Sequence, residues 1–189
     1  MLKRVTLLVF SIALIFSVGG CGKRPAASKV KAQENTKASY HGVSKIYIDT
    51  KIPLNGTIAP NIKSECALDK RLVENIQAAG AAQNIEVVLN GKAGAKGNVL
   101  KLKITDAVSA GNAFIGHRKF VVASGELYEG KKKVASFKSA RLSGGGFFGG
   151  YKSSCAVLGG CTSTMAKDIV QWLKAPTQNA MLGDKHLIK

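Results

Sequence analysis

The sequence predicts a two-layer α+β domain: a mixed, mostly antiparallel sheet of about five strands with two helices packed on one face. Two segments carry apolar residues at helical spacing, and five segments alternate apolar with polar residues or are rich in strand formers. Glycine, proline and asparagine mark the turns between them. The order is strand, helix, four strands, helix, and the length suits one domain, which we place at residues 41–175.

The two helices are predicted from apolar residues three or four positions apart. The first begins near Ser64, a suitable N-cap, and stops near Gly80. Its apolar face contains Leu68, Leu72, Ile76 and Ala79. The second is established by Thr162 and ends before Pro176. Its apolar face contains Met165, Ile169, Trp172 and Leu173. Each helix can therefore bury one face against the sheet.

The strands are expected at 45–49, 85–89, 99–106, 117–129 and 132–142. The third shows the clearest alternation, with Leu100, Leu102 and Ile104 on one side and Lys101, Lys103 and Thr105 on the other. This pattern predicts a half-buried sheet, apolar toward the helices and basic toward water. Residues 107–116 are expected to connect the third strand to the fourth, and the last two strands to form a hairpin around Gly130.

The first 20 residues have the features of a secretory signal peptide. Lys3 and Arg4 precede an apolar run over residues 5–18, which is shorter than the roughly 20 residues of a transmembrane helix. Small residues follow at positions 19 and 20. We therefore expect residues 1–20 to be removed on export.

The end of this segment, Val18-Gly19-Gly20-Cys21, resembles the lipobox of bacterial lipoproteins. The resemblance implies that Cys21 receives a diacylglycerol group, that the chain is cut before it, and that the new amino group is acylated, for example by palmitate. Two or more acyl chains give stable membrane anchoring. Gly22 stands where an Asp favours inner-membrane retention in such proteins, so the resemblance implies the outer membrane, facing the periplasm.

The stretch from residue 21 to residue 40 is polar and poor in large apolar side chains, which predicts a flexible linker. Its basic residues, Lys23, Arg24, Lys29, Lys31 and Lys37, can lie on anionic headgroups. Residues 176–189 have little periodicity and are expected to be a mobile tail.

The charge is strongly positive. The formal charge of +17 falls by two, to +15, when Lys3 and Arg4 leave with the signal peptide. After export, the acidic partners available are envelope polymers, lipid headgroups or other proteins, so we expect no nucleic acid as a partner. A phosphate-binding loop is not supported by the glycine-rich residues 144–150, because Tyr151 occupies the place of the glycine required before Lys152. We therefore expect no nucleotide.

Lipidation of Cys21 leaves Cys66, Cys155 and Cys161, and the periplasm favours a disulfide. Cys155 with Cys161 closes the shortest loop and is slightly preferred, provided that Gly159 and Gly160 form a turn. If a continuous helix holds both cysteines they do not face each other, and Cys66 must pair with one of them. The spacing offers no metal site and no cofactor is indicated.

Two segments are candidates for partner binding. The glycines of residues 144–150 flank Phe147 and Phe148, with Tyr151 following, and Phe114 and Ile115 lie at the tip of the connection before the fourth strand. Exposed aromatic residues often mark an interface. The alternative is a structural role, in which the glycines let the backbone turn or pass close to the sheet.

Catalysis is weakly indicated, and we expect a protein that is not an enzyme. The carboxylates available for a small periplasmic hydrolase are Asp106, Glu126, Glu129 and Asp168, and the histidines are His41, His117 and His186. No nucleophile elbow or Cys/His arrangement accompanies them.

The element order from about residue 44 to residue 174 is similar to that of small envelope accessory lipoproteins. That resemblance implies a binding role in envelope assembly or maintenance, with a protein or glycan partner. Two alternatives remain: a binding module for an acidic envelope polymer, peptidoglycan or lipopolysaccharide, which would use Lys101 and Lys103, or the small hydrolase.

Overall fold

The computed structural model describes residues 41–94, 96–112, 116–143 and 152–188. In chain order the elements are β1 (Lys45–Ile48), α1 (Pro60–Glu65), α2 (Leu68–Ala81), β2 (Glu86–Leu89), β3 (Asn98–Asn112), β4 (Gly116–Glu129), β5 (Lys132–Ser143), α3 (Ser154–Leu173), β6 (Ala180–Gly183) and a 3-10 turn, η2 (Lys185–Leu187). The predicted α+β class is confirmed, and the described residues add a sixth strand and a third, short helix.

The strands form one mixed sheet in the order β2-β1-β3-β4-β5-β6. β1 runs parallel to both β2 and β3, and β6 runs parallel to β5. The two long pairings, β3 with β4 and β4 with β5, are antiparallel. The meander of these three strands is therefore the central part of the sheet.

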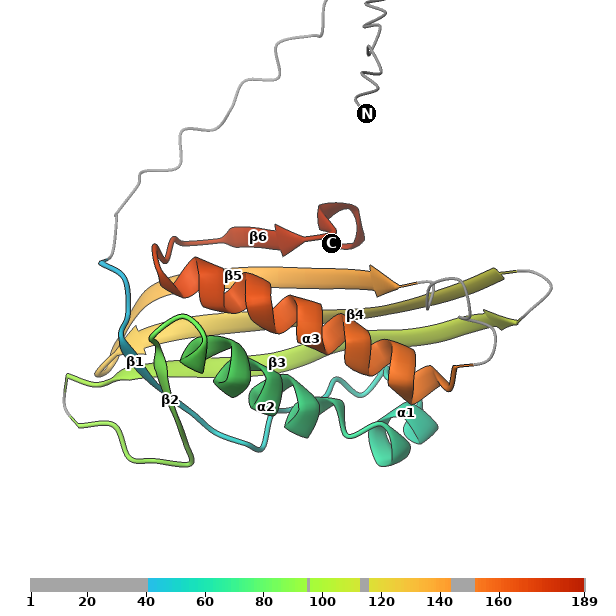
Figure 1. Ribbon diagram of the computed structural model, residues 1–189, viewed down its shortest axis with the longest axis horizontal. Coiled ribbons are helices and arrows are strands. Elements are labelled where there is room, and N and C mark those ends of the chain that lie inside the picture. Colours follow the sequence, from blue (N-terminus) through green and yellow to red (C-terminus); the bar gives the residue numbers. More distant parts are fainter. Residues whose placement is uncertain (1–40, 95, 113–115, 144–151, 189) are drawn as a thin grey trace, which may run out of the picture. The chain divides into compact units, whose positions relative to one another are not determined.

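Helices α2 and α3 lie side by side on one face of this sheet (Figure 1). The apolar residues predicted for each helix are buried, except for the half-buried Ala79, and they meet the inward-facing residues Leu100, Ile104 and Leu127. Phe137 of β5 packs edge-on against Trp172 of α3, with ring centroids 4.9 Å apart. No α-helix among the described residues covers the opposite face, which we call the open face.

The hairpin of β3 and β4 is longer than predicted. The expected connection over residues 107–116 instead continues both strands, with Asn112 paired to Gly116. A bulge at Thr105, between the pairs Ile104–Ala123 and Asp106–Val122, re-aims the strand so that Ala107 stays buried. Phe114 and Ile115 lie outside the described residues.

The C-terminal segment was expected to be a mobile tail, and that expectation is wrong for most of it. Residues 180–183 form β6 on the free edge of β5. Trp172 Nε1 donates to the carbonyl of Thr177 at 3.3 Å, and the amide of Ser136 donates to the same carbonyl at 3.2 Å. These bonds guide a polar segment back to the sheet, where an unpaired strand edge supplies backbone partners.

The preferred disulfide, Cys155–Cys161, is also wrong. Both cysteines lie in the continuous helix α3, six positions apart, and do not face each other. Cys155 is bonded to Cys66 at the end of α1, with a Cα–Cα distance of 4.8 Å and a sequence separation of 89. This is the pairing left open for a continuous helix. Cys161 is a buried free thiol.

Candidate functional site

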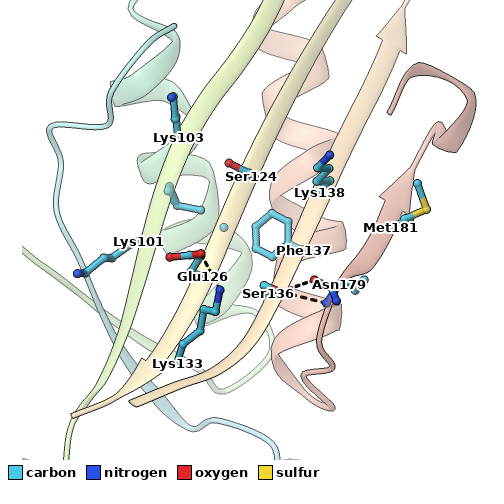
Figure 2. A pocket seen from close by; sticks show the side chains of 13 residues that line it. Lys101, Lys103, Ser124, Glu126, Lys133, Ser136, Phe137, Lys138, Asn179 and Met181 are labelled. Atoms are coloured by element: carbon cyan, nitrogen blue, oxygen red, sulfur yellow. Dashed lines mark hydrogen bonds and ion pairs between the residues drawn. The ribbon is translucent and has the colours of Figure 1, made fainter. Parts of the chain in front are cut away.

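The open face contains a groove of about 690 Å³ over β3, β4 and β5, bounded on one side by β6 (Figure 2). Four lysines line it: Lys101, Lys103, Lys133 and Lys138. Glu126 is the carboxylate among the described lining residues. The groove is therefore basic, and this agrees with the basic open face predicted from β3.

The period-two geometry of the strands brings these side chains together. Lys101 and Lys103 alternate with the buried Leu102 on β3. In the register of the sheet they stand opposite Glu126 and Ser124, and these in turn stand opposite Ser136 and Lys138 of β5. Three strands thus present one continuous polar surface.

Gly125 lies between Ser124 and Glu126 on β4, and close packing on the helix side of the sheet leaves no room for a side chain there. A Cβ at this position would collide with the ring of Phe137, which occupies that space on the helix side of the sheet. The ring is 3% exposed and contacts Trp172. The middle of the sheet beneath the groove is therefore closely packed.

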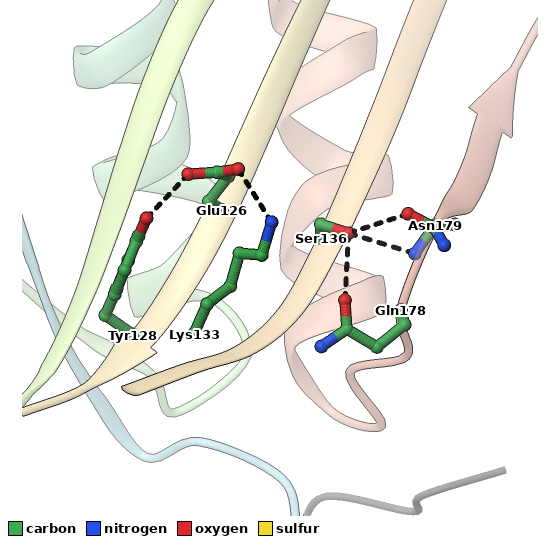
Figure 3. A network of polar contacts seen from close by, with 6 residues as sticks. All are labelled: Glu126, Tyr128, Lys133, Ser136, Gln178 and Asn179. Atoms are coloured by element: carbon green, nitrogen blue, oxygen red, sulfur yellow. Dashed lines mark hydrogen bonds and ion pairs between the residues drawn. The ribbon is translucent and has the colours of Figure 1, made fainter. Parts of the chain in front are cut away.

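Glu126 is held at the centre of a small polar network (Figure 3). Lys133 Nζ lies 3.1 Å from one carboxylate oxygen, and the hydroxyl of Tyr128 donates to the other at 2.8 Å. The hydrogen bond from Tyr128, followed by that from Lys133, lowers the pKa of Glu126 below its usual 4.5. The same bond to Glu126 raises the pKa of Tyr128. The ammonium of Lys101 lies 4.5 Å from the centre of the Tyr128 ring, a cation–π contact.

The wall beside β6 depends on the returning C-terminal segment. The hydroxyl of Ser136 lies 3.2 Å from the side-chain carbonyl oxygens of both Gln178 and Asn179, and it accepts a hydrogen bond from the backbone N–H of Asn179 at 3.0 Å (Figure 3). Asn179 adopts a left-handed conformation with φ of 53°, which turns the chain into β6. Met181 then stands 47% exposed at the rim of the groove.

The carboxylates considered for hydrolysis have other contacts or are widely spaced. Asp168 is bound by Arg141 through two hydrogen bonds of 2.6 Å on the helix side of the sheet. Glu126 is engaged by Lys133 and Tyr128 as described. Asp106 pairs with Val122, four residues from Glu126 along β4, which is about 13 Å. Glu129 lies at the end of β4, outside the groove.

The remaining predicted site residues, for lipidation and for partner binding, belong to parts of the chain that the structure does not describe. Cys21, Phe147, Phe148 and Tyr151 lie outside the described residues, as do Phe114 and Ile115. Among the residues that the structure describes, no three His, Cys, Asp or Glu side chains are grouped as metal ligands. Over the same residues, no helix has both the length and the hydropathy needed to cross a membrane.

The alternation of β3 predicts the basic face of Lys101 and Lys103, but it does not predict that Lys133 and Lys138 lie on the same face. The alternation of residues 117–142 contained a usable signal, because Ser124, Glu126 and Lys138 share one face of the hairpin once its register is known. No comparable sequence pattern predicts that Gln178, Asn179 and Met181 border the groove.

Comparison with known proteins gives distant structural likenesses. No family model matches the chain, and no curated protein matches its sequence. A protein of Xanthomonas campestris from the family DUF330 has a TM-score of 0.49 at 12% identity, over 71% of this chain and 86% of that one. A minor lipoprotein from Acinetobacter baumannii has a TM-score of 0.46 at 9% identity, over 72% and 97%. The PelC dodecamer from Paraburkholderia phytofirmans has a TM-score of 0.46 at 11% identity, over 74% and 94%. These likenesses are distant, and they establish neither a family nor a function for this chain.

Proposed function

We propose that this chain is a lipid-anchored, non-enzymatic protein of the bacterial outer membrane whose periplasmic domain binds an acidic envelope polymer, peptidoglycan or lipopolysaccharide. The observation that carries the proposal is the groove on the open face, where four lysines surround one carboxylate. The carboxylate of Glu126 is already paired with Lys133, so the balance left for a ligand is positive. An anionic polymer is the complementary partner.

The anchoring part of the proposal comes from the sequence. The lipobox-like Val18-Gly19-Gly20-Cys21 supplies the acceptor thiol. The Cys66–Cys155 disulfide supports an oxidising compartment, because such bonds are rare in the cytosol. A tether through residues 21–40 would hold the domain beside its ligand and raise the effective concentration of both.

Labelled palmitate tests the anchor in cells. The full chain should incorporate the label and fractionate with outer membranes, and Cys21→Ser should abolish both. The matched control is Cys161→Ser, which removes another free thiol and should keep both properties. Labelling that survives Cys21→Ser, or membrane association that a high-salt wash cannot reverse in that variant, contradicts lipid anchoring at Cys21.

The groove favours a polymer over a small anion because its charges do not converge on one point. Lys101 and Lys103 are separated by about 7 Å along β3, and Lys133 and Lys138 lie across the sheet on β5. Exposed ammonium–anion contacts are individually weak and are screened by salt. A ligand with many anionic groups can engage several of them together.

Binding is tested with the detergent-extracted full chain, purified peptidoglycan sacculi and immobilised lipopolysaccharide. Lys101→Gln with Lys103→Gln should weaken binding to one of these polymers by about three- to tenfold, and higher salt should reduce the difference. The matched control is Lys70→Gln with Lys167→Gln, which removes the same charge from the exposed helix layer. Equal losses for the two pairs indicate attraction to net charge alone and contradict a groove. Salt-resistant capture of a protein, unaffected by the groove lysines, contradicts the polymer as ligand.

A further inference from the structure

A second hollow of about 500 Å³ adjoins the groove on the open face. The two share Ser124 and Lys138 in their linings, so they are contiguous. Arg118 supplies a further cation to the second hollow, Asp106 supplies a carboxylate and Phe120 an aromatic ring, and His186 also lines it. Arg118 and the shared Lys138 together outnumber this carboxylate, so the basic surface continues beyond the groove described above.

The even-numbered residues of β4 build the floor of both hollows. From Arg118 to Glu126 they point to the open face, in register with the outward residues of β3 and β5. Eight residues of extended strand span about 26 Å. The two hollows thus follow one strand over a length greater than a single sugar or phosphate group requires.

The C-terminal turn makes the other wall of the second hollow. The amide of Asp184 donates to the carbonyl of Ala140 at 2.9 Å, and the carboxylate of Asp184 accepts from the amide of Leu142 at 2.7 Å. These bonds hold η2 against β5, so that Leu187 and Ile188 line the hollow together with Phe120. The second hollow consequently combines apolar surface with basic and hydroxyl groups.

We propose that the two hollows form one binding track and that its ligand is a linear acidic glycan extended along β4. This inference rests on the proposed function and deepens it. The spread of Lys101, Lys103, Lys138 and Arg118 suits anionic groups repeated along a chain, whereas a single phosphate would need converging donors. Sugar rings offer apolar C–H faces beside hydroxyl groups, which match Phe120 in the second hollow and Ser124, which lines both hollows.

An acidic peptide or an acylated anion would match this lining less well. The second hollow is not continuously apolar, since Asp106 and Arg118 lie in it with Phe120, and this is unfavourable for a buried acyl chain. A polyglutamate chain offers carboxylates but no rings, so it has no group that packs against Phe120. The glycan alone uses the charged, hydroxyl and aromatic groups together.

The test uses oligogalacturonates, with polyglutamate of similar length and neutral dextran as comparators, and the full chain by calorimetry. Oligomers of about six sugars span the track and should bind at least tenfold more tightly than those of about two. Arg118→Gln should lower the affinity for the long oligomer about three- to fivefold and leave the affinity for the short one unchanged. Arg71→Gln, an exposed arginine on α2, is the matched control and should change neither.

Each result separates the two levels of the proposal. If short and long oligomers bind with equal affinity, or Arg118→Gln has no effect, the track is wrong while the basic groove stands. If polyglutamate binds as tightly as the long oligomer, and Phe120→Ala weakens both equally, the assignment to a glycan is wrong. If no anion binds and Lys101→Gln with Lys103→Gln has no effect on polymer binding, the proposed function itself fails.

Discussion

Arg141 of β5 donates two parallel hydrogen bonds to the carboxylate of Asp168 of α3, each 2.6 Å long. The side chains are 26% and 22% exposed, so water screens the pair only in part. The bond to Asp168 is the largest influence that raises the pKa of Arg141, and Asp184 adds to it from 4.0 Å. One guanidinium therefore joins the helix layer, the sheet and the C-terminal segment.

Asp168→Asn should lower the free energy of unfolding by about 1 to 3 kcal/mol, because it leaves a partly buried guanidinium without its charged partner. Urea denaturation measures the change. Glu74→Gln is the control, because it removes an exposed ion pair of 3.8 Å on α2 and should cost less than about 0.5 kcal/mol. Similar losses in the two variants would mean that the bidentate geometry at Arg141 contributes nothing.

Reduction of the Cys66–Cys155 disulfide should destabilise the domain by about 3 to 5 kcal/mol, because the bond closes a long loop in the unfolded chain. Cys66→Ser should reproduce the loss. Trypsin without reduction should yield the peptide 64–70 linked to the peptide 153–167, and fragmentation of the latter should place the bond on Cys155. An unlinked peptide 153–167 lighter by two hydrogens would instead indicate a Cys155–Cys161 bond.

The thiol of Cys161 should be unreactive in the folded protein. Burial raises its pKa from 9.0 to about 11, with Asp184 adding to the effect, so the nucleophilic thiolate is scarce at neutral pH. A maleimide reagent at pH 8 should modify this thiol only after denaturation. Rapid modification of the native chain would contradict the buried position, in which Sγ lies 3.8 Å from the carbonyl oxygen of Lys119.

Because the pKa of Cys161 is raised, the free energy of unfolding should depend on pH in the alkaline range. The folded state holds the Cys161 proton more tightly than the unfolded chain, so this stabilisation is complete below about pH 9 and is lost as the pH rises through about 11. Over that window the loss should be about 2 kcal/mol. Cys161→Ala should flatten the plot of unfolding free energy against pH by that amount relative to the wild-type chain. Identical plots for the two chains would contradict the raised pKa of Cys161.

Glu126→Gln should strengthen binding of an anionic polymer about three- to fivefold at neutral pH, since it removes the negative charge from the groove and frees Lys133. Because the pKa of Glu126 is lowered, the wild-type chain should approach this affinity only below about pH 4.5. Glu129→Gln, at the exposed end of the same strand, is the matched control. Equal gains from both changes would locate binding outside the groove.

Gly125→Ala should destabilise the domain by about 1 to 3 kcal/mol, because the new methyl group must displace the Phe137 ring from Trp172. Thermal unfolding measures the loss. In the background of Phe137→Leu, which removes the obstructing ring, the same change should cost much less. A full additive loss in the double variant would show that the ring is not the obstacle.

Features that show as a periodic pattern over neighbouring residues were predicted closely. The alternation of Leu100, Lys101, Leu102 and Lys103 gave the correct inward and outward faces, since successive strand residues must point to opposite sides. The apolar stripe of α3 was likewise correct from Met165 to Leu173. Such patterns depend on each residue's near neighbours and need no knowledge of the rest of the chain.

Features that join distant segments were missed. Residues 180–183 have no strong strand pattern, and they become a strand because β5 offers an unpaired edge. The end of α2 at Ala81 agrees with the predicted stop near Gly80, but the close approach of Gly80 to Val87, which leaves no room for a Cβ, was not foreseen. The choice of Cys66 as partner for Cys155 depends on how α1 meets α3 across 89 residues.

The α+β class, the basic outward face of β3 and the prediction of a lipidated cysteine at position 21 all follow from residues that are neighbours along the chain. Only the folded domain brings Lys101 and Lys103 into one groove with Lys133 and Lys138 and places the C-terminal segment along its side. Those contacts are set by strand register and by edge pairing, which depend on the packing of the whole domain.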